Sequence, residues 1–158
     1  MLLNDWTDSE SATLNPPPTP DMNALELHLS RTTTPIFYLL HESLGLMSLE
    51  LDHISSHLSL CTGIVTTLRG IPFRARREEL PLPLDICAKH NLVQESVFRT
   101  GSEAPGLKDV VLEVATRAND HLNTTRQYME DTRSKNKDTL ESAFGAFVTG
   151  VNVSRIEG

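Results

Sequence analysis

The stretch Leu58–Asp85, LSLCTGIVTTLRGIPFRARREELPLPLD, places three patterns one after another. Apolar residues at helical spacing come first, then a run rich in arginine, and then alternating leucines and prolines. Gly70 and Pro72 are residue types that commonly end a helix, because glycine accepts a left-handed backbone and proline lacks an N–H group. The stretch therefore predicts a helix that ends near Gly70, followed by a basic loop over residues 70–83.

The helix that leads into this loop is predicted from a single apolar stripe. Ser48 is its candidate N-cap. Gly63 lies inside the helix, where it predicts a close approach of another helix rather than a break. The stripe residues recur at steps of three and four, which places them on one helix face: Leu51, Ile54, Leu58, Cys61, Val65 and Leu68.

A second long helix is predicted over residues 107–132. Arg117 falls largely outside its apolar face, and His121 is expected at the surface or half-buried. The apolar face is formed by Leu107, Val111, Val114, Ala118, Leu122, Thr125 and Met129.

The rest of the chain predicts shorter helices, and no segment has the pattern of a strand. One helix should run from Asn23 to about Leu44, with Asn23 as its cap, Glu26 as the partner in a capping box, and a weak point at Pro35. The predicted fold class is all-α. Further short helices are expected over residues 83–90, 94–99 and 140–147.

Composition limits the classes of function. The net charge of −7 argues against nucleic acid as a partner, because phosphate binding needs a face rich in lysine and arginine. No apolar run is long enough to span a bilayer as a helix. Cys61 and Cys87 lie in apolar surroundings and are interpreted as reduced core thiols.

Three regions are predicted along the chain. Residues 1–22 are polar and then rich in proline, which favours an extended, disordered segment. Residues 23–132 should form the helical domain, and residues 133–158 a divergent tail with at most one helix. The first twenty residues are acidic, so they match neither a secretory signal nor an arginine-rich transit peptide.

Three segments of the chain resemble the squalene and phytoene synthase family. They are LDHISSHLSLCTGIVTTLR (residues 51–69), LPLDIC (residues 82–87) and VVLEVATRANDHL (residues 110–122). The resemblance covers residues 23 to about 130 and implies a partial isoprenoid-synthase-type helical bundle. The pattern is most similar to a non-catalytic branch of the family, which assists assembly of mitochondrial respiratory complex I.

The departure from the catalytic members lies in the quoted stretch. In those enzymes a run of carboxylates follows the arginine that corresponds to Arg69 and holds magnesium against diphosphate. This chain has Gly70, Phe73 and Arg74 in the corresponding places, and Asp85 is the carboxylate that survives in the Leu-Pro return. Magnesium needs several converging oxygen ligands. The sequence therefore predicts no metal site, no cofactor and no enzymatic activity.

The resemblance implies a function through protein contacts. The expected partner is a complex I subunit or assembly intermediate, on the matrix side of the inner mitochondrial membrane, with peripheral contact to inner-membrane lipids. The alternative is a prenyl-diphosphate transferase with atypical metal ligation.

Two groups of residues are candidate sites. Arg69, Arg74, Arg76 and Arg77 could bind a diphosphate, anionic lipid or partner, or could be a solvated loop balanced by Glu78 and Glu79. Asp52, His53 and His57 form the second group. Because His53 and His57 are four residues apart they share a helix face, as zinc ligands do, but without a third ligand nearby a contact surface is the favoured interpretation.

Overall fold

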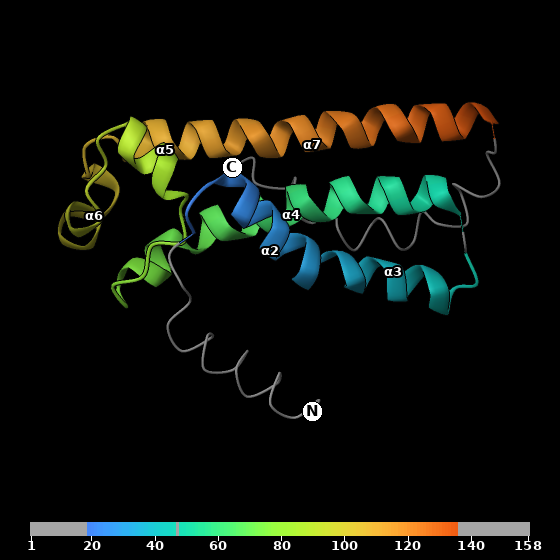
Figure 1. The fold of residues 1–158 in the computed structure, drawn as a ribbon, viewed down its shortest axis with the longest axis horizontal. Coiled ribbons are helices and arrows are strands. Elements are labelled where there is room, and N and C mark those ends of the chain that lie inside the picture. The colour runs from blue at the N-terminus through green and yellow to red at the C-terminus, as the bar shows by residue number, and fades with distance from the viewer. Residues whose placement is uncertain (1–18, 47, 136–158) are drawn as a thin grey trace, which may run out of the picture.

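The computed structural model describes residues 19–46 and 48–135, and every regular element within them is a helix (Figure 1). The predicted all-α class is confirmed. None of these helices combines the length and the hydropathy that crossing a membrane requires. The elements are α2 (Met22–Thr32), α3 (Thr34–Ser43), α4 (Leu49–Ala75), α5 (Leu84–Lys89), α6 (Gln94–Thr100), the 3₁₀ turn η1 (Gly101–Glu103) and α7 (Leu107–Lys135).

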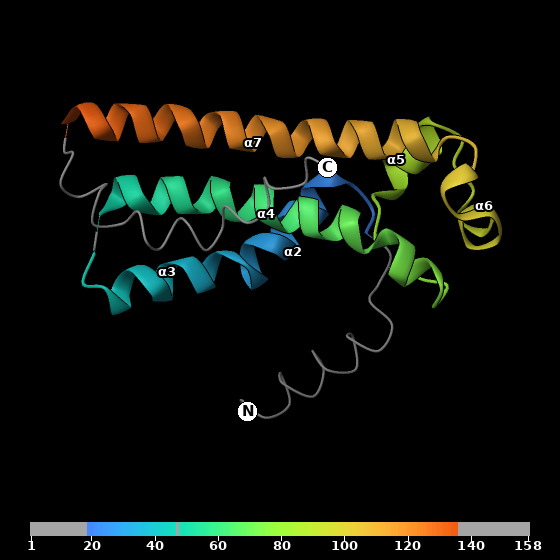
Figure 2. The same cartoon turned by 180° about the vertical axis from the view of Figure 1, so that it is seen from behind.

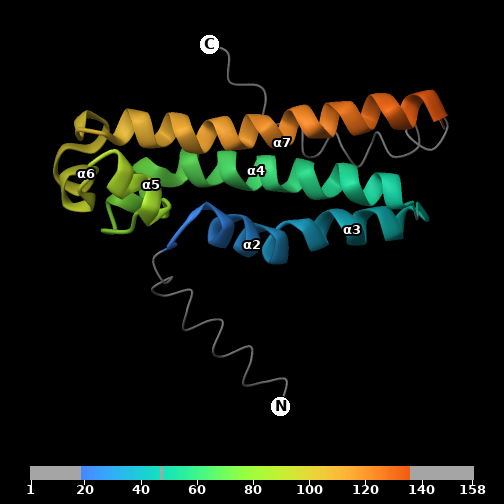
Figure 3. The same ribbon diagram turned by 45° about the horizontal axis from the view of Figure 1, so that its top comes forward.

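The two long helices α4 and α7 lie side by side and run in opposite directions (Figures 1 and 2). Helices α2 and α3 follow one another along the opposite side of α4, so that α4 is the central member of the layer (Figure 3). The short helices α5 and α6 gather at the end where α4 finishes and α7 begins. Helix α4 therefore packs against neighbours on two sides.

The core lies along α4, and Gly63 lets α2 approach it closely. A Cβ atom added at Gly63 would lie 2.7 Å from Cδ2 of Leu29, so the predicted close approach is confirmed. Cys61 and Cys87 are buried free thiols, as expected, and burial raises the pKa of each. The fully buried apolar side chains of the two long helices are Leu51, Ile54, Ile64, Val110 and Val114.

Helix α4 continues past the predicted end, so the prediction of a loop from Gly70 is wrong. Pro72 lies inside the last turns of the helix, and only residues 76–83 connect α4 to α5. Proline removes one helical hydrogen bond, the one to the carbonyl of Leu68. The next helical turn is retained because Ile71 is buried in the core and Ala75 packs against it.

The start of the first helix also differs from the prediction. The cap is Asp21 instead of Asn23, because Oδ1 of Asp21 accepts a hydrogen bond from the N–H of Ala24 at 2.7 Å. Glu26 therefore takes no part in a capping box. The predicted weak point is confirmed, since the chain breaks at Thr33 between α2 and α3.

The remaining helices agree closely with their predicted bounds. The short helices α5 and α6 lie where they were expected, and α7 extends three residues beyond the predicted end at residue 132. The carbonyls of Thr19 and Pro20 accept hydrogen bonds from the N–H groups of Leu84 and Asp85, which ties the segment before α2 to the start of α5. The expected helix over residues 140–147 lies outside the described residues.

Candidate functional site

The four arginines of the basic group lie on the last turns of α4 and the connection after it, and all four are exposed. Within the described part of the chain none of them forms an ion pair, so Glu78 and Glu79 do not pair with them. The guanidinium of Arg77 lies over the ring of Phe73, 5.0 Å from its centroid, a cation–π geometry. This end of α4 is therefore a cationic surface within an acidic protein.

The residues at this end do not fit the magnesium cluster of the family's enzymes. Asp85 uses Oδ1 to accept the N–H of Ile86 at 2.8 Å, at the start of α5. The positions after Arg69 supply a glycine, an aromatic ring and further guanidinium groups. The guanidinium groups repel a divalent cation, and the other two side chains offer no oxygen ligand. Across residues 19–46 and 48–135, no three His, Cys, Asp or Glu side chains are grouped as metal ligands would be.

An apolar groove of about 480 Å³ lies beside the cationic surface. Arg76 is the charged side chain on its wall, and it links the groove to the basic group. The apolar walls come from α4, α6 and the first turns of α7, through Leu68, Ile71, Ala75, Phe98, Leu107 and Val111.

The second predicted group divides between two sides of α4. His53 and His57 both face α7, where the ring of Tyr128 stacks with them at centroid distances of 5.6 and 6.0 Å. Because Tyr128 stacks on both imidazoles, they are held as parts of a ring stack and do not converge on a common point. Asp52 lies toward α3, where its charge acts on the buried His41.

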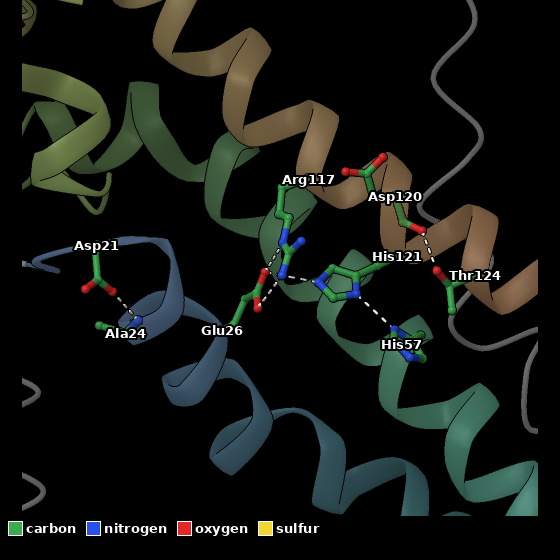
Figure 4. Close-up of polar contacts among 8 residues, drawn as sticks. All are labelled: Asp21, Ala24, Glu26, His57, Arg117, Asp120, His121 and Thr124. Carbon is green, nitrogen blue, oxygen red and sulfur yellow. Dashed lines mark hydrogen bonds and ion pairs between the residues drawn. The ribbon is translucent and has the colours of Figure 1, made fainter. Parts of the chain in front are cut away.

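The structure reveals a polar cluster that the sequence did not predict, formed by Glu26, His57, Arg117 and His121 (Figure 4). It joins α2, α4 and α7. The guanidinium of Arg117 donates to both carboxylate oxygens of Glu26, with Nη2 3.1 Å from Oε2. Nε2 of His121 lies 3.1 Å from Oε1 of Glu26, and Nδ1 of His121 lies 3.0 Å from Nδ1 of His57. We call these four residues the internal cluster.

The hydrogen-bond geometry limits where protons can lie in the internal cluster. The carboxylate of Glu26 can only accept, so His121 donates from Nε2. If His121 is neutral, its Nδ1 accepts a hydrogen bond from Nδ1 of His57; if His121 is protonated, its Nδ1 donates and Nδ1 of His57 accepts. One hydrogen lies between the two rings, so the pair cannot hold both imidazoles fully protonated at this distance.

The surroundings shift two of these groups in a consistent way. Burial acts to raise the pKa of Glu26, but the hydrogen bonds from Arg117 and His121 outweigh it and hold that pKa below its usual value. Burial lowers the pKa of His57, and the nearby positive charges of His121, His53 and Arg117 lower it further. The folded state therefore favours an ionised Glu26 and a neutral His57.

His121 is buried, with a relative exposure of 7%, so the expectation of a surface or half-buried residue is wrong. Its partner Glu26 is distant in sequence, and no local pattern links the two. One signal was available: an ionisable residue next to a predicted apolar stripe usually has a partner when it is buried. That signal does not name the partner.

Two further polar pairs lie in the core between α3 and α4. Thr34 and Ser59 join their hydroxyl groups at 2.6 Å, and Ser55 Oγ lies 3.3 Å from Nδ1 of His41. Ser55 and His41 have relative exposures of 0% and 2%, so no substrate reaches this serine and histidine. Their role is to satisfy buried polar groups where α3 packs on α4.

Comparison with known proteins agrees with the sequence pattern. The sequence model described as squalene/phytoene synthase matches residues 2–152. A mouse protein named NADH dehydrogenase (ubiquinone) complex I, assembly factor 6 is 33% identical over 84% of this chain and 37% of its own length. The human protein of the same name is 32% identical over 84% of this chain and 38% of its own length. A Drosophila homologue is 37% identical over 65% of this chain and 31% of its own length.

The chain thus spans between 31% and 38% of the length of these curated relatives. No solved structure matches it.

Proposed function

This chain belongs to the squalene/phytoene synthase family, and we propose that it is a non-catalytic factor in the assembly of mitochondrial respiratory complex I. The relatives that match it along most of its length carry the name of a complex I assembly factor. Because the chain spans about 37% of the mouse relative, the proposal concerns the activity of this helical part.

The observation that supports a binding role is the end of α4. Where a transferase needs carboxylates for magnesium and diphosphate, this chain presents exposed guanidinium groups beside an apolar groove. The ionisable residues of the internal cluster satisfy one another, and so do Lys89, His90 and Glu113. A surface without metal ligands but with an apolar groove is suited to binding a partner. It is not suited to promoting the departure of a diphosphate group.

The proposed place of action is the matrix side of the inner mitochondrial membrane. The proposed partner is a complex I subunit or an assembly intermediate. Contact of the exposed arginines with anionic inner-membrane lipids remains a prediction from the resemblance and from their charge.

The experiment is expression of the chain, with a mitochondrial targeting sequence and an affinity tag, in cells that lack their own copy of this assembly factor. Native gel separation followed by mass spectrometry is expected to place the chain in the same bands as partly assembled complex I. Migration only as the free chain, in mitochondria that contain those intermediates, would contradict the proposal.

A parallel assay tests the transferase reading. The purified chain is incubated with farnesyl or geranylgeranyl diphosphate and magnesium, and a sample without protein serves as background. We expect no condensation product. Product formation that depends on Arg69 would overturn the non-catalytic assignment.

A further inference from the structure

The groove at the end of α4 has the size and lining of a binding site. Its volume of about 480 Å³ lies within the range of about 300–1,000 Å³ that is usual for such sites. Helices α4, α6 and α7 and the turn η1 contribute its walls, so an apolar side chain placed in it would be covered from several directions. Burial of apolar surface there would drive binding, since the groove is open to solvent.

One edge of the groove is positively charged. Arg76 lines it, and Arg69 lies seven residues earlier on α4, which places it on the same strip of the helix. Phe73 lies between them in the sequence and is 61% exposed. A ligand in the groove therefore meets the guanidinium of Arg76. Arg69 and the ring of Phe73 lie outside the groove on the same side of α4, where a ligand that extends past this edge can reach them.

The charges around the groove favour a compact ligand over an extended anionic surface. The turn η1, which also lines the groove, continues into the exposed Glu103, and the connection after α4 carries Glu78 and Glu79. An anionic membrane would meet these carboxylates together with the arginines. A peptide can set its own carboxylates against Arg69 and Arg76 alone.

We propose that this groove docks one amphipathic segment of a partner protein, with an apolar side chain between α4, α6 and α7 and carboxylates beside Arg69 and Arg76. This inference rests on the proposed binding function and names the surface that performs it. The docked segment is acidic along the side that faces α4. Lysine or arginine side chains placed there would be repelled by Arg69 and Arg76, which would cost several-fold in affinity.

The probes are two synthetic amphipathic helices of equal length, with the same leucine stripe and either glutamate or lysine beside it. Each is labelled with a fluorophore and titrated with the full chain. We expect the glutamate peptide to bind about tenfold more tightly than the lysine peptide. In Arg69→Glu/Arg76→Glu the preference is expected to reverse.

Filling the groove provides the second test. Ser102→Trp places a large ring from the exposed residue Ser102 into the groove, and Ala75→Trp does so from α4. Each is expected to weaken the glutamate peptide about tenfold. Leu112→Trp is the matched control, because Leu112 is 67% exposed on α7 and does not line the groove.

The outcomes separate the possibilities. Equal affinity for the two peptides, or binding unchanged by Ser102→Trp, would overturn the proposal. Binding to vesicles of phosphatidylglycerol without binding to either peptide would also overturn it and assign the surface to lipid. Because these assays contain no complex I, they can fail while the chain still migrates with assembly intermediates, and the reverse is equally possible.

Discussion

The internal cluster and the end of α4 use similar residues in opposite ways. In the internal cluster, Arg117 and His121 both donate to the carboxylate of Glu26, and His121 also contacts His57, so the cluster joins three helices. At the end of α4, Arg69 and Arg76 are exposed and form no ion pair within the described residues. The first arrangement stabilises the fold, because its charges are already satisfied. The second leaves its charges available to a partner.

The largest effect should come from removing the carboxylate of the internal cluster. Glu26→Ala leaves Arg117 and the buried His121 without their acceptor, and we expect a loss of about 2–3 kcal/mol of unfolding free energy. Chemical denaturation measures it, with the exposed Glu42→Ala as the control. A loss no greater than that of the control would mean that the cluster does not stabilise the fold.

Two glycines of α4 allow its packed middle to be compared with its C-terminal end. Gly63→Ala forces its Cβ against Leu29, and we expect a loss of about 1–2 kcal/mol. Gly70→Ala, at a half-buried position of the same helix, places its Cβ 3.9 Å from Nε of Arg74, an ordinary contact, and should be neutral or stabilising by up to about 1 kcal/mol. Thermal melting of the two variants checks the opposite signs. Equal losses would show that α2 does not press on α4 at Gly63.

Acidic pH should weaken the internal cluster. The folded-state pKa of His57 lies below its ordinary value of 6.5, so the unfolded chain binds the extra proton first, and stability is expected to fall as the pH drops below 6.5. The pKa of the buried His41 is also lowered, so His41 contributes to the same loss of stability in acid. The lowered pKa of Glu26 adds a further loss as the pH falls below 4.5.

Denaturation midpoints measured from about pH 8 to about pH 5 test this dependence. His57→Gln should reduce the slope, by at most about 1.4 kcal/mol per pH unit, and His28→Gln, at an exposed position of α2, is the control. A slope identical in both variants would remove His57 from the explanation.

The smallest effect on stability is expected at the end of α4. Arg69→Gln/Arg76→Gln removes two exposed charges that form no ion pair with residues 19–46 or 48–135, so the change in unfolding free energy should stay below about 0.5 kcal/mol. The same variant is expected to lose its preference for the acidic peptide. A large loss of stability would show that these arginines are structural, and would erase the distinction between the two regions.

The sequence predicted the helical elements well where periodicity was strong. The apolar stripe of α4 and that of α7 gave their positions, and the glycine inside α4 gave the close approach of α2. It failed at the end of α4, because the rule that Pro72 ends a helix ignores the packing of Ile71 in the core. Local propensity is weaker than burial of an apolar side chain at such a position.

The candidate residues divide in the same way. Sequence reasoning identified the basic group and the pair of histidines on α4, since each is visible within one short stretch. It could not find the internal cluster, whose members Glu26 and Arg117 are separated by 91 residues. A charged residue reveals in the sequence that it needs a partner, but not where the partner will come from.

The amino-acid sequence by itself determined that the chain forms helices, that it is acidic, and that the carboxylates of the family's enzymes are missing after Arg69. These properties follow from residue type and spacing along one helix or loop. The tertiary structure alone decided that Glu26 pairs with Arg117 and His121, and that Arg76 borders a groove. Which charges are satisfied and which remain free depends on the packing of helices distant in sequence, and that packing is set by the burial of all their apolar faces together.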